Sequence, residues 1–199
     1  RVENYTLAQL KKFYLRDTKG RLTQEKIPTL EEALLLAKDK ILVNMDKSYR
    51  YFEDCYAVIE KTHTSDQVLM KGKKTRAELE SKHRKYVDKR LFMPVVRLSD
   101  PEAKETVLDY LEHRVPIAFE FSVPDDTMAL VDDFELIRQK GASIWVNAIR
   151  AKNNAGNDDQ QALENPEVYD WYIKNHINII QTDRPQLLLD YLRARGLHK

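Results

Sequence analysis

The sequence predicts an α/β fold, a (β/α)8 barrel of the TIM type whose N-terminal strands are missing from this chain. Three observations predict it. Short apolar segments alternate with helical segments six times, which is typical of parallel βαβ units. A closed barrel of eight units usually needs about 250 residues, whereas this chain has 199. The chain begins at Arg1 without an initiator methionine. We therefore expect one incomplete barrel domain over residues 1–199.

The first forty residues predict helices and turns rather than strands. Thr6 is a typical N-cap for a helix that runs to about residue 13, and residues 17–21 indicate a turn. Thr29 with Glu32 three residues later predicts a capping box. The helix that follows places three apolar residues on one face, namely Leu30, Leu34 and Ala37.

The rest of the chain alternates between strand and helix. The predicted strands have the continuous apolar pattern of strands buried on both faces, and they cover residues 40–46, 67–71, 91–96, 116–121, 142–147 and 177–183. The helices between and after them cover about 49–61, 76–88, 101–113, 128–140, 167–174 and 185–195, and Gly196 is expected to end the last one. No glycine-rich loop follows a strand, which disfavours a dinucleotide-binding fold.

Composition excludes several classes of partner. The net charge of +1 provides no strong field toward nucleic acid or an anionic membrane surface. No apolar run approaches the roughly 20 residues that span a bilayer. We therefore expect no nucleic-acid partner and no stable membrane insertion. Cys55 is the only cysteine, so the chain can form no internal disulfide.

Polar side chains stand at the predicted carboxyl ends of the strands, where barrels carry their functional groups. Carboxylates can hold a hard divalent cation, and lysine or arginine can hold a phosphate. Together they favour metal-assisted phosphoester chemistry. The residues concerned are Asn44, Asp46, Lys71, Arg97, Glu120, Trp145, Asn147, Gln181 and Asp183.

Several of these assignments have a structural alternative. Asp46 either binds a cation or caps the following helix, and Asp183 either contacts a substrate or caps the last helix. Lys71 either binds phosphate or lies in a solvated turn. Glu120 is expected to be buried and would then need a partner. Trp145 forms either a wall for the substrate or part of the core.

The five histidines do not supply an acid–base pair at the strand ends. All of them fall on predicted helices, helix ends or turns, and none has a partner at metal-ligand spacing. They are His63, His83, His113, His176 and His198.

Four segments of the sequence carry a resemblance to a known family. They are Ile27-Pro28-Thr29-Leu30-Glu31-Glu32-Ala33-Leu34, Leu42-Val43-Asn44-Met45-Asp46-Lys47, Ile144-Trp145-Val146-Asn147 and Ile179-Ile180-Gln181-Thr182-Asp183-Arg184-Pro185. These segments resemble the glycerophosphodiester phosphodiesterase family, whose members are phospholipase C-like phosphodiesterase barrels. They occur in the family's order and span nearly the whole chain, and the last is the most specific. A Bacteroides-type subgroup resembles the chain most.

The resemblance implies hydrolysis of a small-molecule glycerophosphodiester to an alcohol and glycerol 3-phosphate. It implies a divalent cation, Ca²⁺ or Mg²⁺, held by three carboxylates, and two histidines that serve as acid and base. The histidine motifs of the family are expected before Arg1, so the chain alone is expected to be inactive. Of the metal ligands only Asp46 carries over, at the position of a glutamate. Family members are often exported, which implies a periplasmic or secreted location.

The family's lysine lies two residues after its carboxylate, a position that Ser48 occupies here. Lys47 can reach the site only if the strand has already ended, because neighbouring strand residues point to opposite faces. Lys71 is the other source of a phosphate contact. The residues expected to bind substrate are Lys47, Lys71, Glu120, Trp145, Asn147, Gln181 and Asp183.

Other readings of the chain remain open. The domain is either part of an enzyme or a non-catalytic barrel, degenerate or devoted to binding a phosphorylated ligand. An aldolase- or isomerase-type barrel would use Lys71 for a Schiff base, but the four segments disfavour it. An incomplete barrel exposes strand edges, so we expect a missing N-terminal segment or another copy of the chain to cover them. Residues 153–159 are expected to form a solvated loop over the site, with ligand contact by Asp158 and Asp159 as the alternative.

Overall fold

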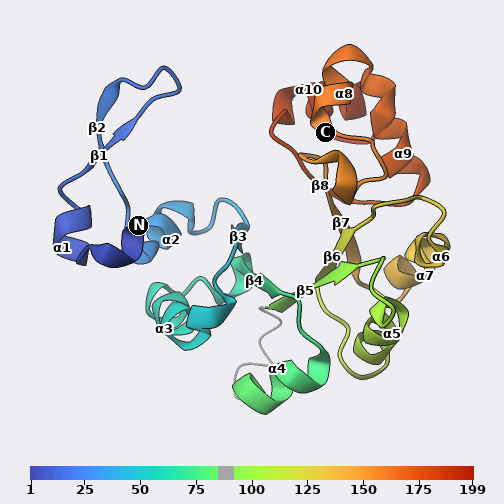
Figure 1. The fold of residues 1–199 in the computed structure, drawn as a ribbon, viewed down its shortest axis with the longest axis horizontal. Coiled ribbons are helices and arrows are strands. Elements are labelled where there is room, and N and C mark those ends of the chain that lie inside the picture. The colour runs from blue at the N-terminus through green and yellow to red at the C-terminus, as the bar shows by residue number, and fades with distance from the viewer. Residues whose placement is uncertain (85–91) are drawn as a thin grey trace. The chain divides into compact units, whose positions relative to one another are not determined.

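The computed structural model describes residues 1–84 and 92–199. Within these residues six strands form one sheet in the order β3-β4-β5-β6-β7-β8 (Figure 1), which confirms the predicted α/β class with sequential strands. The chain divides into two compact units, Arg1–Leu69 and Met70–Lys199. The predicted end of one helix at residues 85–88 and the predicted strand residue Leu91 lie outside the described residues. No helix in the described ranges is both long and apolar enough to cross a bilayer.

The N-terminal unit opens with elements that carry no buried side chain. Helix α1 (Leu7–Leu10) is capped by Thr6 as predicted but is shorter than expected. An antiparallel hairpin of β1 (Tyr14–Arg16) and β2 (Leu22–Lys26) follows where only a turn was predicted. Almost every residue of the hairpin is exposed, so the sequence lacks the buried apolar pattern that would have revealed two strands.

The core of the N-terminal unit lies between helices α2 (Leu30–Ala37) and α3 (Phe52–Thr62). The predicted capping box is confirmed, since Glu32 N donates to Thr29 Oγ1 at 3.1 Å and Thr29 N donates to Glu32 Oε2 at 2.7 Å. Strand β3 (Val43–Met45) stands between the two helices in the sequence and a short 3-10 turn precedes α3. The buried residues of both helices include Leu34, Phe52, Tyr56 and Ile59.

The C-terminal unit is built on parallel strands. Met70 of β4 pairs with Phe92 of β5, Val95 of β5 with Glu120 of β6, and β6, β7 and β8 continue in parallel. The alternation of strand and helix predicted from the sequence is therefore confirmed here. The strands are β4 (Val68–Gly72), β5 (Phe92–Arg97), β6 (Ala118–Ser122), β7 (Ser143–Asn147) and β8 (Ile179–Gln181).

The helices of this unit depart from the prediction at two places. The single helix expected at 128–140 is two helices that meet at Asp133, next to Asp132, and aspartate has a low propensity for a helix interior. Helix α8 was not predicted, and it begins at Asp159, the last residue of the loop expected at 153–159. The helices are α4 (Arg76–His83), α5 (Ala103–His113), α6 (Ala129–Asp132), α7 (Phe134–Gln139), α8 (Asp159–Glu164), α9 (Tyr169–Lys174) and α10 (Pro185–Ala194).

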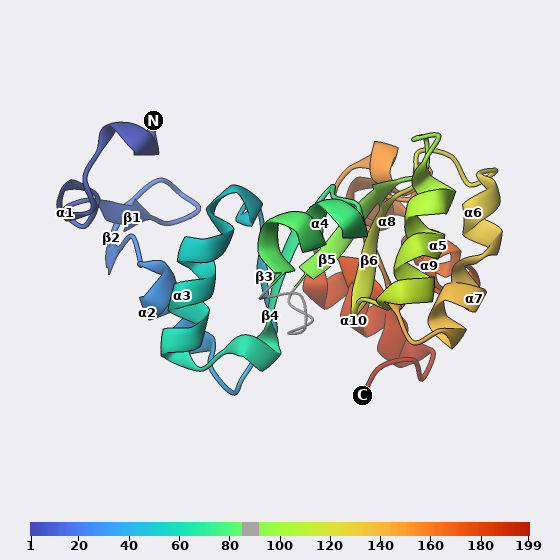
Figure 2. The same cartoon turned by 90° about the horizontal axis from the view of Figure 1, so that it is seen from below.

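One face of this parallel sheet packs against helices. The ring of Phe119 meets Tyr110 of α5 edge-on with centroids 5.9 Å apart, and Phe121 lies 4.7 Å from the ring of Phe134 in α7. Helix α5 lies beside β6 in both views (Figures 1 and 2). Ile144 and Val146 of β7 belong to the same buried cluster. Since strand side chains alternate between faces, Glu120 of β6 and Trp145 of β7 point to the opposite face.

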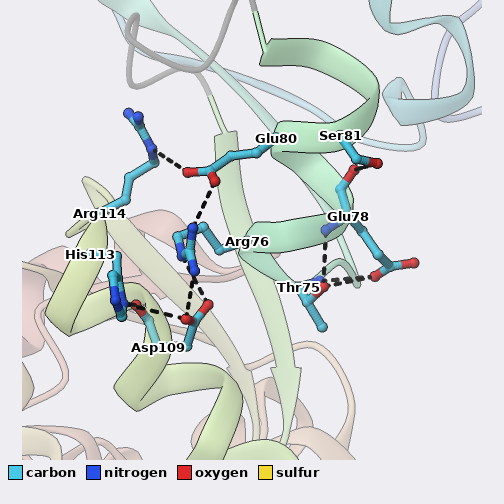
Figure 3. A network of polar contacts seen from close by, with 8 residues as sticks. All are labelled: Thr75, Arg76, Glu78, Glu80, Ser81, Asp109, His113 and Arg114. Atoms are coloured by element: carbon cyan, nitrogen blue, oxygen red, sulfur yellow. Dashed lines mark hydrogen bonds and ion pairs between the residues drawn. The ribbon is translucent and has the colours of Figure 1, made fainter.

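Charged residues join helix α4 to helix α5 (Figure 3). The Arg76 guanidinium donates to both oxygens of Asp109, at 3.0 and 2.9 Å, and to Glu80 at 2.7 Å. Arg114 donates to the other oxygen of Glu80 at 3.4 Å. The hydrogen bonds to Asp109 raise the pKa of Arg76 above its ordinary value. This two-pronged contact fixes the start of α4, directly after β4, against α5.

Replacing Arg76 by methionine should lower the free energy of unfolding by about 1 kcal/mol, because a partly buried, bidentate network contributes more than an isolated surface pair. Urea denaturation measures the change. Lys104→Met is the matched control, because Lys104 forms a single exposed ion pair with Asp133 at 3.3 Å. Equal effects of the two substitutions would show that the network adds nothing beyond ordinary surface charge.

Candidate functional site

The strand register gathers the predicted polar residues of the C-terminal unit on one face. Glu120 is aligned with Val95 of β5 and with Trp145 of β7, and Asn147 is aligned with Gln181 of β8. Lys71 is aligned with Met93, two residues before Val95 and therefore on the same side. All alternate with the helix-facing residues. We call this set the polar face, which consists of Lys71, Glu120, Trp145, Asn147 and Gln181.

A buried ion pair lies in the polar face. Lys71 Nζ stands 2.7 Å from Glu120 Oε2, and the two side chains are only 9% and 13% exposed. The solvated-turn alternative for Lys71 is therefore wrong, because this residue lies inside β4. The expectation that Glu120 is buried and partnered is confirmed. The partners are 49 residues apart in the sequence, so only the parallel pairing of β4, β5 and β6 brings them together.

Trp145 stands next to Glu120 in the register and is only partly buried. Its indole Nε1 donates to Gln181 Oε1 at 3.3 Å, which joins the middle of β7 to the last residue of β8. Trp145 does not belong to the buried cluster on the helix-facing side, and its role as a wall for the substrate stays a prediction. Asn147 instead serves a local turn, because its Oδ1 accepts from Ile149 N at 2.8 Å.

The loop after β7 folds back over the strand ends. Asn154, which is fully buried, donates from Nδ2 to the carbonyl oxygen of Asn147 at 3.0 Å. Asp158 caps α8 by accepting from Gln161 N at 3.0 Å. Asp159 is only 5% exposed, so the expectation of a solvated loop is wrong at this residue. Its side chain contacts Tyr169, Thr182 and the backbone of Asp183, which lie 10 to 24 residues further along the chain. No local pattern in the sequence therefore indicated its burial, and its alternative role in ligand contact stays a prediction.

Asp183 does not cap the last helix. The N-cap of α10 is Arg184, without a side-chain capping bond, so the capping alternative is wrong. The backbone N–H of Asp183 donates instead to Asp159 Oδ2 at 2.7 Å. Gly196 follows α10 in the left-handed conformation, with φ of 69°, and ends the helix as predicted.

Two tyrosines lie under this loop. Tyr169 Oη donates to Asp159 Oδ1 at 3.4 Å, and Tyr172 Oη donates to the carbonyl oxygen of Asn157. Burial, followed by the nearby Asp159 charge, raises the pKa of Tyr169 to about 12. Burial likewise raises the pKa of Tyr172. The loop therefore rests on phenols that stay neutral in ordinary buffers.

Stability should fall as the pH rises from about 10 to about 12. An unfolded tyrosine has a pKa near 10, whereas folded Tyr169 titrates at about 12. Below pH 10 both states keep the proton and the full stabilisation is present; above it the unfolded chain loses the proton first. Urea denaturation at pH 9 and pH 11 should show a smaller fall for Tyr169→Phe than for the wild type. Identical falls would contradict the assignment.

Asp46 and Lys47 belong to the N-terminal unit. Asp46 follows the last residue of β3, and the N-cap positions of the 3-10 turn and of the helix after it are Ser48 and Tyr51. Lys47 has φ of 58° and lies beyond the end of the strand, which is the condition under which it was expected to reach a site. Their roles as metal and substrate ligands stay predictions.

The described residues do not by themselves fit a metal ion. No group of three or more histidine, cysteine, aspartate or glutamate side chains within residues 1–84 and 92–199 is placed to hold one. Of the five histidines, His83 and His113 end helices, and His63 and His176 lie in the turns after helices, as predicted, whereas His198 lies beyond the last helix. His63 follows α3 in the left-handed conformation, and His113 and His176 contact the carboxylates of Asp109 and Glu135.

A cavity of about 350 Å³ lies at the carboxyl end of β5. Val95, which is aligned with Glu120, forms part of its lining together with Arg97. Lys73 and Asp100 stand on opposite loops of the cavity and form an ion pair at 2.7 Å. None of the five residues of the polar face lines this cavity, whose walls also include the starts of α4 and α5.

The fold is similar to that of a solved enzyme. The crystal structure of a glycerophosphoryl diester phosphodiesterase from Parabacteroides distasonis ATCC 8503 matches with a TM-score of 0.72 and 23% sequence identity. The match covers 98% of this chain and 65% of that chain. This likeness shows the fold, an incomplete parallel α/β barrel as predicted, and the chain spans less than two thirds of the length of that enzyme. No curated protein matches the chain.

The family model described as a domain of unknown function, DUF4996, matches residues 92–192. These residues hold strands β5 to β8 and every member of the polar face except Lys71. Because the match covers half of the chain, the chain belongs to the DUF4996 family.

Proposed function

We propose that the protein carrying this chain hydrolyses glycerophosphodiesters to an alcohol and glycerol 3-phosphate, and that the polar face binds the glycerol phosphate moiety. The observation that carries the proposal is the buried Lys71–Glu120 ion pair beside Trp145. Glu120 and Trp145 are the middle residues of β6 and β7, and Asn147 and Gln181 on the same face are the last residues of β7 and β8, at the sheet end where parallel barrels bind ligands. The four family-like segments and the fold of the Parabacteroides enzyme support it.

The polar face has the chemistry to hold a phosphate and a polyol. The Lys71 ammonium is a compact cation, and its position is fixed by Glu120 at 2.7 Å, so little side-chain freedom remains to be lost on binding. Trp145 presents an aromatic surface against which the glycerol carbons can pack. Gln181, which accepts from the indole, keeps that ring in place and offers an amide N–H₂ group to a hydroxyl.

In this proposal the chain binds and orients the substrate but does not complete the reaction. The polar face contains no histidine, and the described residues form no three-ligand metal site. General acid–base groups and the cation, Ca²⁺ or Mg²⁺, would therefore come with residues beyond those described, and Asp46 is the one ligand proposed from this chain. We expect the chain alone to bind glycerol 3-phosphate without hydrolysing a diester.

Calorimetric titration with sn-glycerol 3-phosphate tests binding by the chain. We expect saturable binding of sn-glycerol 3-phosphate, weaker binding of inorganic phosphate and no binding of glycerol. In a parallel fluorescence titration, sn-glycerol 3-phosphate should quench the emission of Trp145. The absence of any saturable signal would remove the proposed role of the polar face. Hydrolysis is tested on the longest natural protein that contains the chain, with sn-glycero-3-phosphocholine as substrate and release of glycerol 3-phosphate as the readout.

A second candidate is a non-catalytic barrel that binds a phosphorylated ligand. The absence of a three-ligand metal cluster in residues 1–84 and 92–199 favours it. The two candidates differ in one result. The non-catalytic protein would bind glycerol 3-phosphate but release none from any glycerophosphodiester, with or without Ca²⁺ or Mg²⁺.

The unpaired edges of the sheet indicate that the chain needs a partner segment to cover them. In the described part of the chain β3 and β8 are the terminal strands of the sheet. We propose that further residues of the natural protein, or a second copy of the chain, cover these edges. Molecular mass in solution separates the two. A periplasmic or secreted location is proposed from the family resemblance, and cell fractionation tests it.

A further inference from the structure

We infer that Asp159 is a positioning residue, which fixes the end of β8 so that Gln181 meets Trp145 in the polar face. Its role in binding rests on the proposed function, whereas its effect on the geometry of the strand ends does not. Asp159 lies at the start of α8, and no part of its carboxylate belongs to the polar face itself.

The carboxylate of Asp159 is buried and bound by groups that follow β8. Thr182 Oγ1 donates to Oδ1 at 2.6 Å, and the N–H of Asp183 donates to Oδ2 at 2.7 Å. Tyr169 Oη donates to Oδ1 at 3.4 Å. Hydrogen bonds to a charged acceptor are about twice as strong as neutral ones. The two residues that directly follow Gln181 are therefore held by one side chain.

The backbone of Asp159 reaches the neighbouring strand. Its N–H donates to the carbonyl oxygen of Ala148 at 2.7 Å, and the N–H of Ala148 donates to the carbonyl oxygen of Gln181 at 2.8 Å. Asp159 thus connects the residue after β7 with the residues after β8. Trp145 and Gln181 lie on β7 and β8, before the residues that Asp159 connects, and the indole Nε1 of Trp145 lies 3.3 Å from Gln181 Oε1. Without the Asp159 carboxylate, the residues after β8 lose the only side-chain hydrogen bonds to α8 among the described contacts.

The adjacent Asp158 provides a matched control. It carries the same side chain, lies one residue earlier and caps α8 through Gln161 N, but it makes no described contact with β8. Removing this cap costs about 1 kcal/mol. A change that follows only from a weakened α8 would therefore appear in Asp158→Ala as well, whereas a change in the strand ends should appear only at Asp159.

The indole N–H resonance of Trp145 reports the contact directly. The chain has two tryptophans, so Trp171→Phe assigns the signals in a ¹H–¹⁵N spectrum. Gln181→Leu gives the position of the resonance when the hydrogen bond is absent. We expect Asp159→Ala to move the Trp145 signal toward that position and to weaken binding of sn-glycerol 3-phosphate at least tenfold. Asp158→Ala should leave the Trp145 resonance at its wild-type position and the affinity within twofold of the wild type.

Asp159→Asn keeps the inference testable if the alanine variant fails to fold. The amide retains one acceptor oxygen, so we expect the same shift with smaller amplitude. The inference is overturned if a folded Asp159 variant leaves the Trp145 resonance unmoved, or if Asp158→Ala moves it equally. If the wild-type chain does not bind sn-glycerol 3-phosphate, the proposed function fails, and the resonance still decides whether Asp159 positions Gln181.

Discussion

Lys71→Met should lower the free energy of unfolding by about 3 kcal/mol, because it leaves the Glu120 carboxylate in a buried place without the ammonium beside it. Removing one partner of a buried ion pair usually costs roughly 3–5 kcal/mol. Glu120 is 13% exposed, and the partial access of water should keep the loss toward the lower end of that range. Urea denaturation at neutral pH, monitored by circular dichroism, measures it.

Lys61→Met is the control for this substitution. Lys61 Nζ lies 2.7 Å from Glu31, the same distance as in the buried pair, but the two side chains are 65% and 38% exposed. An exposed pair of this kind contributes about 0–1 kcal/mol. Similar losses for Lys61→Met and Lys71→Met would mean that burial of Glu120 does not matter. That result would contradict the proposal that the polar face holds a buried ion pair whose lysine binds a phosphate.

The parts of the fold that could be predicted are those with periodic burial. Strand β7 alternates between buried and partly buried residues, and its predicted span of 142–147 differs from the observed one by a single residue. The capping box at Thr29 was equally readable, because its two residues are local. The hairpin Tyr14–Lys26 could not be recognised, since its strands are exposed on both faces and make no pattern.

Some features of the site were missed because they depend on contacts between distant segments. The sequence indicated that Glu120 needs a partner, but nothing local identifies Lys71 as that partner across β5. Asp159 resembled any loop aspartate in the sequence. Its burial follows from Thr182 and Asp183, which return to it only after α9 and β8 have been placed. Parallel sheets join residues far apart in the chain, so site geometry emerges only with the register.

Replacing both members of the buried pair separates stability from binding. The double variant Lys71→Met with Glu120→Leu should be as stable as the wild type, or more stable by about 1–4 kcal/mol, because hydrophobic residues of similar volume often replace a buried ion pair without loss. Its affinity for sn-glycerol 3-phosphate should nevertheless fall by about 10- to 100-fold, since a hydrogen bond to a charged group contributes about 1.5–3 kcal/mol.

The two measurements on this double variant distinguish a structural ion pair from a binding one. Calorimetric titration gives the affinity and urea denaturation gives the stability of the same preparation. A stable double variant with wild-type affinity would show that Lys71 and Glu120 serve only the packing of β4, β5 and β6. A stable variant that no longer binds would show that Lys71 and Glu120 are needed for ligand binding and not for stability, because an apolar pair would then stabilise β4, β5 and β6 equally well.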